Sequence, residues 1–100
     1  MRIYNFWKGG KLNEEVVNRL IGRLHRDKWH TFSRREDGFT WATKGAFYLK
    51  LEDAAIVLYY NEPELEKMSY VGEIGYGRRQ SQKLKRLIQW EANRRGVSHV

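Results

Sequence analysis

The chain has 100 residues, which is enough for one domain and leaves little room for a second. Hydrophobic residues make up 41% of it and aromatic residues 14%, a composition that argues against disorder. The absence of cysteine excludes disulfide bonds and thiolate metal sites, and no apolar run is long enough for a membrane span. We therefore expect a single domain over residues 1–100 that is soluble and cytoplasmic.

The net charge of +7 is unevenly distributed along the chain. Residues 1–50 carry 11 Lys and Arg against 5 Asp and Glu, residues 51–77 carry 1 against 6, and residues 78–100 carry 7 against 1. Such a basic balance favours nucleic acid or an anionic membrane as a partner. The acidic segment between two basic ones predicts separate charged faces, unless it pairs with the last helix inside the fold.

The first elements follow from residue type and spacing. Residues 2–7 are rich in Ile, Tyr, Phe and Trp and are typical of a strand. Asn13 is expected to cap a helix over residues 14–27, whose apolar residues repeat at three- and four-residue steps. The opposite side of this helix carries Arg19, Arg23 and Arg26.

The middle of the chain predicts an antiparallel meander. Asp37-Gly38 is its strongest hairpin signal. With these two residues as the loop, a largely aromatic face is formed by Phe32, Arg34, Phe39 and Trp41. Further strands are expected at residues 46–51 and 56–60. Together with the helices, they predict an α+β fold with an antiparallel sheet of about four strands.

The second half of the chain predicts two helices, with an ambiguous segment between them. Pro63 favours the first turn of a short helix in which Leu65 and Met68 face inward. Three glycines leave residues 70–77 ambiguous between helix and strand. The last helix is expected over residues 78–95, with Gly96 as its C-cap.

A helical wheel divides the last helix into two arcs. The apolar arc consists of Leu84, Leu87, Ile88 and Ala92. The opposite arc, called the basic arc below, consists of Arg79, Lys83, Arg86, Trp90 and Arg94. Arg86 and Arg94 lie four residues on either side of Trp90, so both can reach its ring.

The basic arc predicts a nucleic-acid surface, because cations bind phosphates and an indole stacks on a base. The structural alternative is that Arg–Trp stacking only stabilises the helix surface, or that Trp90 packs on a neighbouring strand. Arg34 and Arg35 beside the hairpin turn, and Arg19, Arg23 and Arg26 on the outside of the first helix, could extend the surface. The expected binding residues are therefore Arg78, Arg79, Lys83, Arg86, Trp90, Arg94, Arg34 and Arg35.

The glycine segment Gly72–Gly77 leads into two arginines and a helix, a combination that would suit a phosphate. A strand, a glycine turn and a long helix in succession resemble the coenzyme A pyrophosphate loop of the GNAT acetyltransferases. The loop of that family begins with Gln or Arg, and the matching position of this chain, three residues before Gly75, is Gly72. The fold of that family also has more strands after the helix. An acyltransferase is therefore kept only as an alternative.

No metal site, cofactor or catalytic residue is expected. His25, His30 and His99 have no cysteine partners and no metal-type spacing. The acidic residues between 62 and 66 are interpreted as a solvated helix start.

The leading hypothesis is a small basic protein that binds nucleic acid, DNA or RNA, through the basic arc. One alternative is a protein-binding accessory factor or inhibitor, of the phage or mobile-element type, that acts on a nucleic-acid-processing machine. A second alternative is a small enzyme, either a nuclease toxin or the acyltransferase. No membrane partner is expected, and the oligomeric state is open. A buried Trp90 would reduce the basic arc to an ordinary helix surface.

Overall fold

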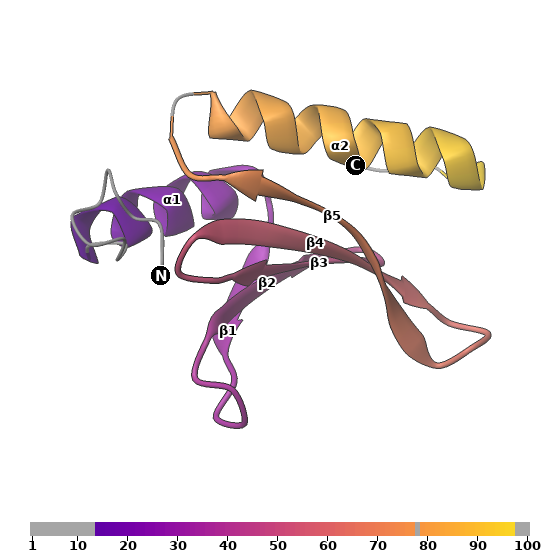
Figure 1. Cartoon of the computed structure of the whole chain (residues 1–100), viewed down its shortest axis with the longest axis horizontal. Helices are drawn as coiled ribbons and strands as arrows, with labels where there is room; N and C mark the ends of the chain where they lie inside the picture. Colours follow the sequence, from indigo (N-terminus) through magenta and orange to yellow (C-terminus); the bar gives the residue numbers. More distant parts are fainter. Residues whose placement is uncertain (1–13, 78, 98–100) are drawn as a thin grey trace.

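The computed structural model describes residues 14–77 and 79–97. A five-stranded antiparallel sheet carries both helices on one face (Figure 1), and its strands neighbour each other in chain order. The elements are α1 (Glu14–Arg26), β1 (His30–Ser33), β2 (Thr40–Lys44), β3 (Phe47–Leu51), β4 (Ala55–Glu62), β5 (Lys67–Gly75) and α2 (Gln80–Arg95). The α+β class and the antiparallel sheet are confirmed.

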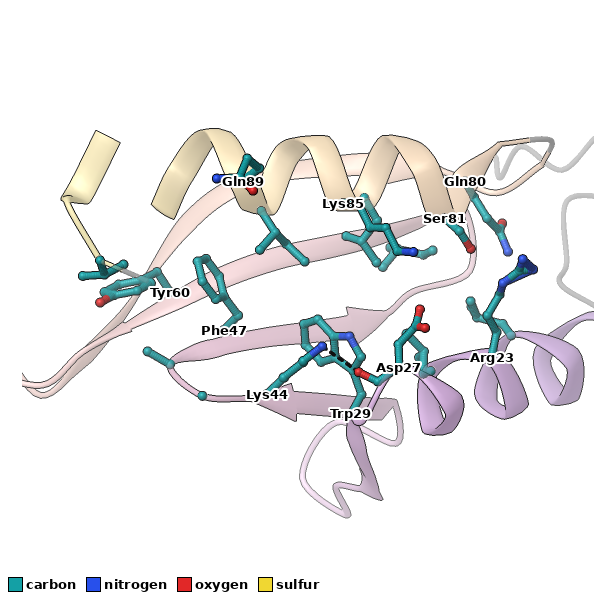
Figure 2. Close-up of a pocket in the computed structure, with 18 residues that line it drawn as sticks. Arg23, Asp27, Trp29, Lys44, Phe47, Tyr60, Gln80, Ser81, Lys85 and Gln89 are labelled. Atoms are coloured by element: carbon teal, nitrogen blue, oxygen red, sulfur yellow. Dashed lines mark hydrogen bonds between the residues drawn. The ribbon is translucent and has the colours of Figure 1, made fainter. Parts of the chain in front are cut away.

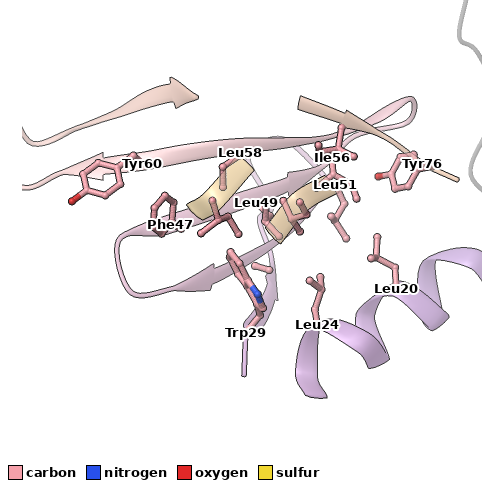
Figure 3. Close-up of a cluster of buried hydrophobic side chains, with 14 of the residues drawn as sticks. Leu20, Leu24, Trp29, Phe47, Leu49, Leu51, Ile56, Leu58, Tyr60 and Tyr76 are labelled. Carbon is pink, nitrogen blue, oxygen red and sulfur yellow. The ribbon is translucent and has the colours of Figure 1, made fainter. Parts of the chain in front are cut away.

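The core lies between the sheet and the helices (Figure 3). Side chains alternate across a strand, and every second residue of β3, and of β4 as far as Tyr60, is buried on the helix side. These residues are Phe47, Leu49 and Leu51 of β3 and Ile56, Leu58 and Tyr60 of β4. The helices add Leu20, Leu24, Leu84, Ile88 and Ala92 to the same cluster.

Both helices end in a left-handed residue. After α1, Lys28 has a φ of 73°, and the Trp29 amide donates to the Leu24 carbonyl at 2.9 Å. This turn brings Trp29 into the core. After α2, Gly96 has a φ of 71°, and the Val97 amide donates to the Ala92 carbonyl. Gly96 is therefore the C-cap that the sequence predicts.

The β1–β2 turn lies where Asp37-Gly38 predicts it, but it is longer. Phe32 pairs with Trp41, two residues from the pairing expected for a two-residue loop. One oxygen of the Asp37 carboxylate accepts from the Phe39 amide at 2.9 Å and the other from the Trp41 indole at 3.0 Å. Those hydrogen bonds, first of all the one from the Phe39 amide, lower the pKa of Asp37. A shift of two keeps side chains on their face, so Phe32 and Trp41 still lie together.

The helix expected at Pro63 is wrong. Residues 63–66 form the turn between β4 and β5, in which Glu62 pairs with Lys67. Leu65 does not face inward, since it is 63% exposed, and Met68 is also exposed. The ambiguous segment from residue 70 belongs to β5, so the described sheet has five strands where about four were expected.

The structure explains why one of the three glycines in the ambiguous segment, Gly72, is a glycine. A Cβ at this position would lie 3.3 Å from Cδ2 of Leu87, so glycine allows α2 to approach the strand closely. Register in the same region shifts between Leu58 and Tyr59, which marks an irregularity between β4 and β5.

The strand expected at residues 2–7 and the cap at Asn13 lie outside the described residues. Within the described part, neither helix combines the length and apolarity needed to cross a membrane. The same residues contain no group of three or more side chains suited to holding a metal ion.

Candidate functional site

The outward side of α2 presents the basic arc. Leu84, Ile88 and Ala92 fix the orientation of the helix by packing on the sheet. The opposite side is consequently turned to solvent, and all of its described members are exposed: Arg79, Lys83, Arg86, Trp90 and Arg94. Arg79 occupies the N-cap position of α2 with a φ of 60°. The remaining expected residue of this region, Arg78, lies outside the described residues.

Trp90 is the most informative member of the arc, and 58% of it is exposed. The guanidinium carbon of Arg94 lies 5.6 Å from the centroid of the indole. A cation held beside an aromatic face at this distance is attracted by the ring. Among the described residues, this contact on Trp90 involves Arg94 and not Arg86. The indole therefore stands in solvent with one cation beside it.

The cations of the arc differ in how far they are neutralised. Arg94 donates to both oxygens of Glu91, at 3.2 and 2.7 Å. No ion pair involving Arg79, Lys83 or Arg86 is present among residues 14–77 and 79–97. These three charges are available to an external anion, whereas that of Arg94 is largely compensated within the helix.

Glu91 anchors the end of α2 from inside. It is 1% exposed and also accepts a hydrogen bond from Nε of Arg95. Arg95 in turn contacts both oxygens of Glu62 on β4, at 3.0 and 2.7 Å, and stacks 3.9 Å from the centroid of the Tyr60 ring. This network joins the last turn of α2 to the end of β4.

The network also sets the protonation of its two carboxyls. Burial acts to raise the pKa of Glu91, but hydrogen bonds from Arg94 and Arg95 outweigh it and hold that pKa below its ordinary value. Hydrogen bonds from Arg95 and Ser69 lower the pKa of Glu62. Both carboxylates are therefore ionised at neutral pH. Glu91 compensates Arg94 and Arg95, and Glu62 compensates Arg95.

The acidic segment does not neutralise the basic arc. Its one described ion pair with α2 joins Glu62 to Arg95, which is outside the arc. Glu52 pairs with Lys50 at 3.2 Å, and Glu73 accepts a hydrogen bond from Tyr70. Within residues 14–77 and 79–97, the ion pair between the acidic segment and α2 thus lies at the end of the helix, away from the basic arc.

Arg34 and Arg35 lie away from the basic arc. They belong to the β1–β2 turn, which extends from the sheet on the side opposite α2 (Figure 1). Arg34 lies 5.1 Å from the centroid of the Trp41 ring and 3.7 Å from the Glu36 carboxylate. The expected binding residues are consequently divided between two surfaces.

The second surface is the open face of the sheet, defined by side chains that alternate with the core residues. Across the five strands it carries His30, Phe32, Trp41, Tyr48, Lys50, Tyr59 and Tyr70. Trp41 stacks on Tyr59 with a centroid distance of 5.7 Å, and Tyr59 meets Tyr70 edge to face at 6.3 Å. A shallow hollow of about 490 Å³ here is bordered by Phe32, Arg34, Arg35, Tyr48 and Met68.

The sequence revealed only part of this open face. Phe32 and Trp41 lie on one face, as the hairpin signal predicts, but the register that pairs them directly differs by two residues from the expected one. The tyrosines of β3, β4 and β5 join them through the pairing of consecutive strands, in which Tyr48 lies opposite Tyr59 and Tyr59 opposite Tyr70. The predicted meander makes consecutive strands neighbours, but it does not fix the register that aligns these tyrosines, and it does not include β5.

Comparison with known protein families, curated proteins and solved structures finds no match to this chain.

Proposed function

We propose that this protein binds nucleic acid along the outward side of α2. The observation that carries the proposal is the 58% exposed Trp90, beside an arginine and on the same side as three cations without ion pairs in the described chain. A single exposed apolar side chain is common on protein surfaces, so the proposal rests on the combination of the indole with cations on the same side of the helix. Nucleic acid uses both parts of the surface, since its phosphates attract the cations and its bases stack on the ring.

The surface is long enough to follow one strand of nucleic acid over several phosphates. Lys83 and Arg94 are separated by 11 residues of continuous helix, which is about 16 Å at the rise of an α-helix. At the duplex rise of about 3.4 Å per nucleotide of one strand, that length spans about four or five phosphates, and it spans fewer in an extended single strand. Trp90 lies within this span, so a base unstacked from that strand could lie on its ring. The proposed ligand is therefore nucleic acid with at least one unpaired base.

Replacement of Trp90 by alanine tests the stacking. We expect Trp90→Ala to weaken binding of a single-stranded oligonucleotide by about 1–3 kcal/mol, the range found for removing one base–aromatic stack. Fluorescence anisotropy of a labelled oligonucleotide at low salt measures the affinity. Because the side chain is mostly exposed, the variant should retain the fold and the wild-type thermal unfolding midpoint.

Trp90→Phe is the matched control, since phenylalanine keeps an aromatic face at the same position. It should retain most of the affinity that Trp90→Ala loses. Equal binding by all three proteins would show that no base stacks at this position. Absence of any oligonucleotide binding by the unaltered protein at low salt would refute the proposed function.

A protein partner is a second candidate, because three exposed apolar side chains gather on one hairpin. Leu65, Met68 and Tyr70 lie on the β4–β5 turn and the strand after it, and Leu65 and Tyr70 are at least 60% exposed. Exposed apolar patches of this kind are typical of protein interaction sites. The hairpin projects away from the helices, so a protein bound there would leave the basic arc free (Figure 1).

Site-specific photo-crosslinking distinguishes the two candidates. A photoreactive residue is introduced either at Leu65 or at Lys83 in the full chain. Under the nucleic-acid proposal, we expect an oligonucleotide to cross-link at position 83 and not at position 65. Cross-linking of a single protein at position 65, without nucleic acid at position 83, would favour the protein partner instead.

A further inference from the structure

A cleft separates the two helices on the covered side of the sheet. α1 contacts β1 and α2 contacts β5, so the two helices pack at opposite edges of the sheet. The space between them has a volume of about 450 Å³, which is in the range of small-molecule sites in proteins. Figure 2 shows that it is bounded by α2 on one side and by α1 and β2–β3 on the other.

The floor of the cleft is apolar and comes from several elements. Trp29, Phe47 and Tyr60 provide aromatic surface from the sheet side, and Leu84 and Ile88 provide aliphatic surface from α2. These residues also belong to the buried core, so their positions are fixed by packing and do not depend on an occupant. A preformed apolar floor favours a ligand with a hydrocarbon or aromatic body.

The charged groups that line the cleft are mainly cationic. Among the described residues that line it, Arg23, Lys44 and Lys85 accompany one carboxylate, that of Asp27. Lys44 donates to the Asp27 backbone carbonyl at 2.6 Å and lies 6.0 Å from the centroid of the Trp29 ring. Figure 2 shows Lys85 pointing from α2 into the space, with Lys44 and Asp27 on the opposite wall. An anionic group above the apolar floor would therefore find a positive potential.

We propose that this cleft binds a small anionic amphiphile, an apolar body with one anionic headgroup. The body contacts the floor around Trp29 and Phe47, and the headgroup lies between Lys85 and Lys44. The site is separate from the basic arc, because Lys83 points outward and Lys85, two residues later, lines the cleft. This inference goes beyond the proposed function and does not depend on it.

Decanoate, used below the concentration at which it forms micelles, is the probe, and decanol of the same chain length is the neutral control. The indole N–H signals of the full-length protein in a ¹H–¹⁵N spectrum report the site of binding. We expect decanoate to shift the signal of Trp29 and to leave those of Trp41 and Trp90 unchanged. Trp41 lies on the open face and Trp90 on the basic arc, so both are internal references. Decanol should bind about tenfold more weakly.

Two charge reversals on α2 give the matched test. Lys85→Glu should weaken decanoate binding about tenfold, since it replaces an attraction by a repulsion at the cleft. Lys83→Glu makes the same chemical change on the outward side and should leave decanoate affinity unchanged. For oligonucleotide affinity we expect the opposite order, so that the Lys83→Glu variant binds the oligonucleotide more weakly than the Lys85→Glu variant. Failure of one site therefore does not imply failure of the other.

Several outcomes would overturn the proposal. A folded protein whose Trp29 signal does not respond to millimolar decanoate has no site open to this class of ligand. Equal affinity for decanoate and decanol would remove the role of the cations. A Trp29 signal that responds only to oligonucleotide, or only to protein concentration, would assign the cleft to nucleic acid or to a second copy of the chain.

Discussion

Reversing two charges on the outward side of α2 should reduce oligonucleotide affinity about 100-fold at low salt. In the Lys83→Glu/Arg86→Glu variant, each reversal removes one phosphate contact and adds a repulsion, which we estimate at about 1.4 kcal/mol per site. Both residues are exposed and make no ion pair in the described chain, so the fold should be unaffected. Fluorescence anisotropy over a range of salt concentrations measures the affinity and its salt dependence.

The salt dependence separates phosphate contacts from a general effect of net charge. The slope of log K against log salt should fall in magnitude by about two, because two counterions fewer are released on binding. Arg26→Glu/Lys67→Glu is the control, since it changes the net charge by the same amount at exposed positions off α2. A loss of affinity as large in this control would mean that the charge of the whole protein, and not the basic arc, attracts the nucleic acid.

The last helix shows how far a local pattern predicts a surface. Its apolar residues recur at helical spacing and pack on the sheet, so the outward position of Trp90 follows from the period alone. What the period did not show is the role of Glu91. The two arginines at three and four residues after it were a possible signal for an anchored carboxylate, but its third connection, through Arg95 to Glu62, depends on the tertiary fold.

The hairpin signals predicted where the chain turns better than how it turns. Asp37-Gly38 does mark a turn, yet the register differs by two residues because the Asp37 side chain holds both the Phe39 amide and the Trp41 indole. The assignment of Pro63 to a helix was wrong because its local signal fits two kinds of element. A fixed φ near −65° suits both the first turn of a helix and the second position of a β-turn, so proline alone does not distinguish them.

The glycines of β5 could not be interpreted without the rest of the fold. In isolation they weaken any strand assignment, and for that reason the fifth strand was missed. Gly72 lies directly beneath Leu87 of α2, where a larger side chain would separate the helix from the sheet. The same contact between Gly72 and Leu87 helps to set the orientation of α2. The candidate site therefore depends on a tertiary contact that local sequence propensities do not predict.

Two identical substitutions, Leu58→Ala and Leu65→Ala, should have very different effects on stability. Leu58 is fully buried in β4, among the core residues of Figure 3. Its truncation removes apolar contact and leaves a cavity that the close-packed core fills only partly, at a cost of about 2–5 kcal/mol. Leu65 lies in the β4–β5 turn and is 63% exposed, so the same change there should cost less than about 0.5 kcal/mol.

Urea denaturation of both variants measures the difference, provided that the m-value stays constant and the transition is two-state. The pair also decides between the turn and the helix that Pro63 suggests. In that helix Leu65 would face inward, and its truncation would approach the cost at Leu58. Equal destabilisation would therefore contradict the turn at residues 63–66 and, with it, the exposed apolar hairpin that makes a protein partner a candidate. A large difference would instead keep Leu65 available for contact, because a side chain that contributes little to folding can be used at an interface without loss of stability.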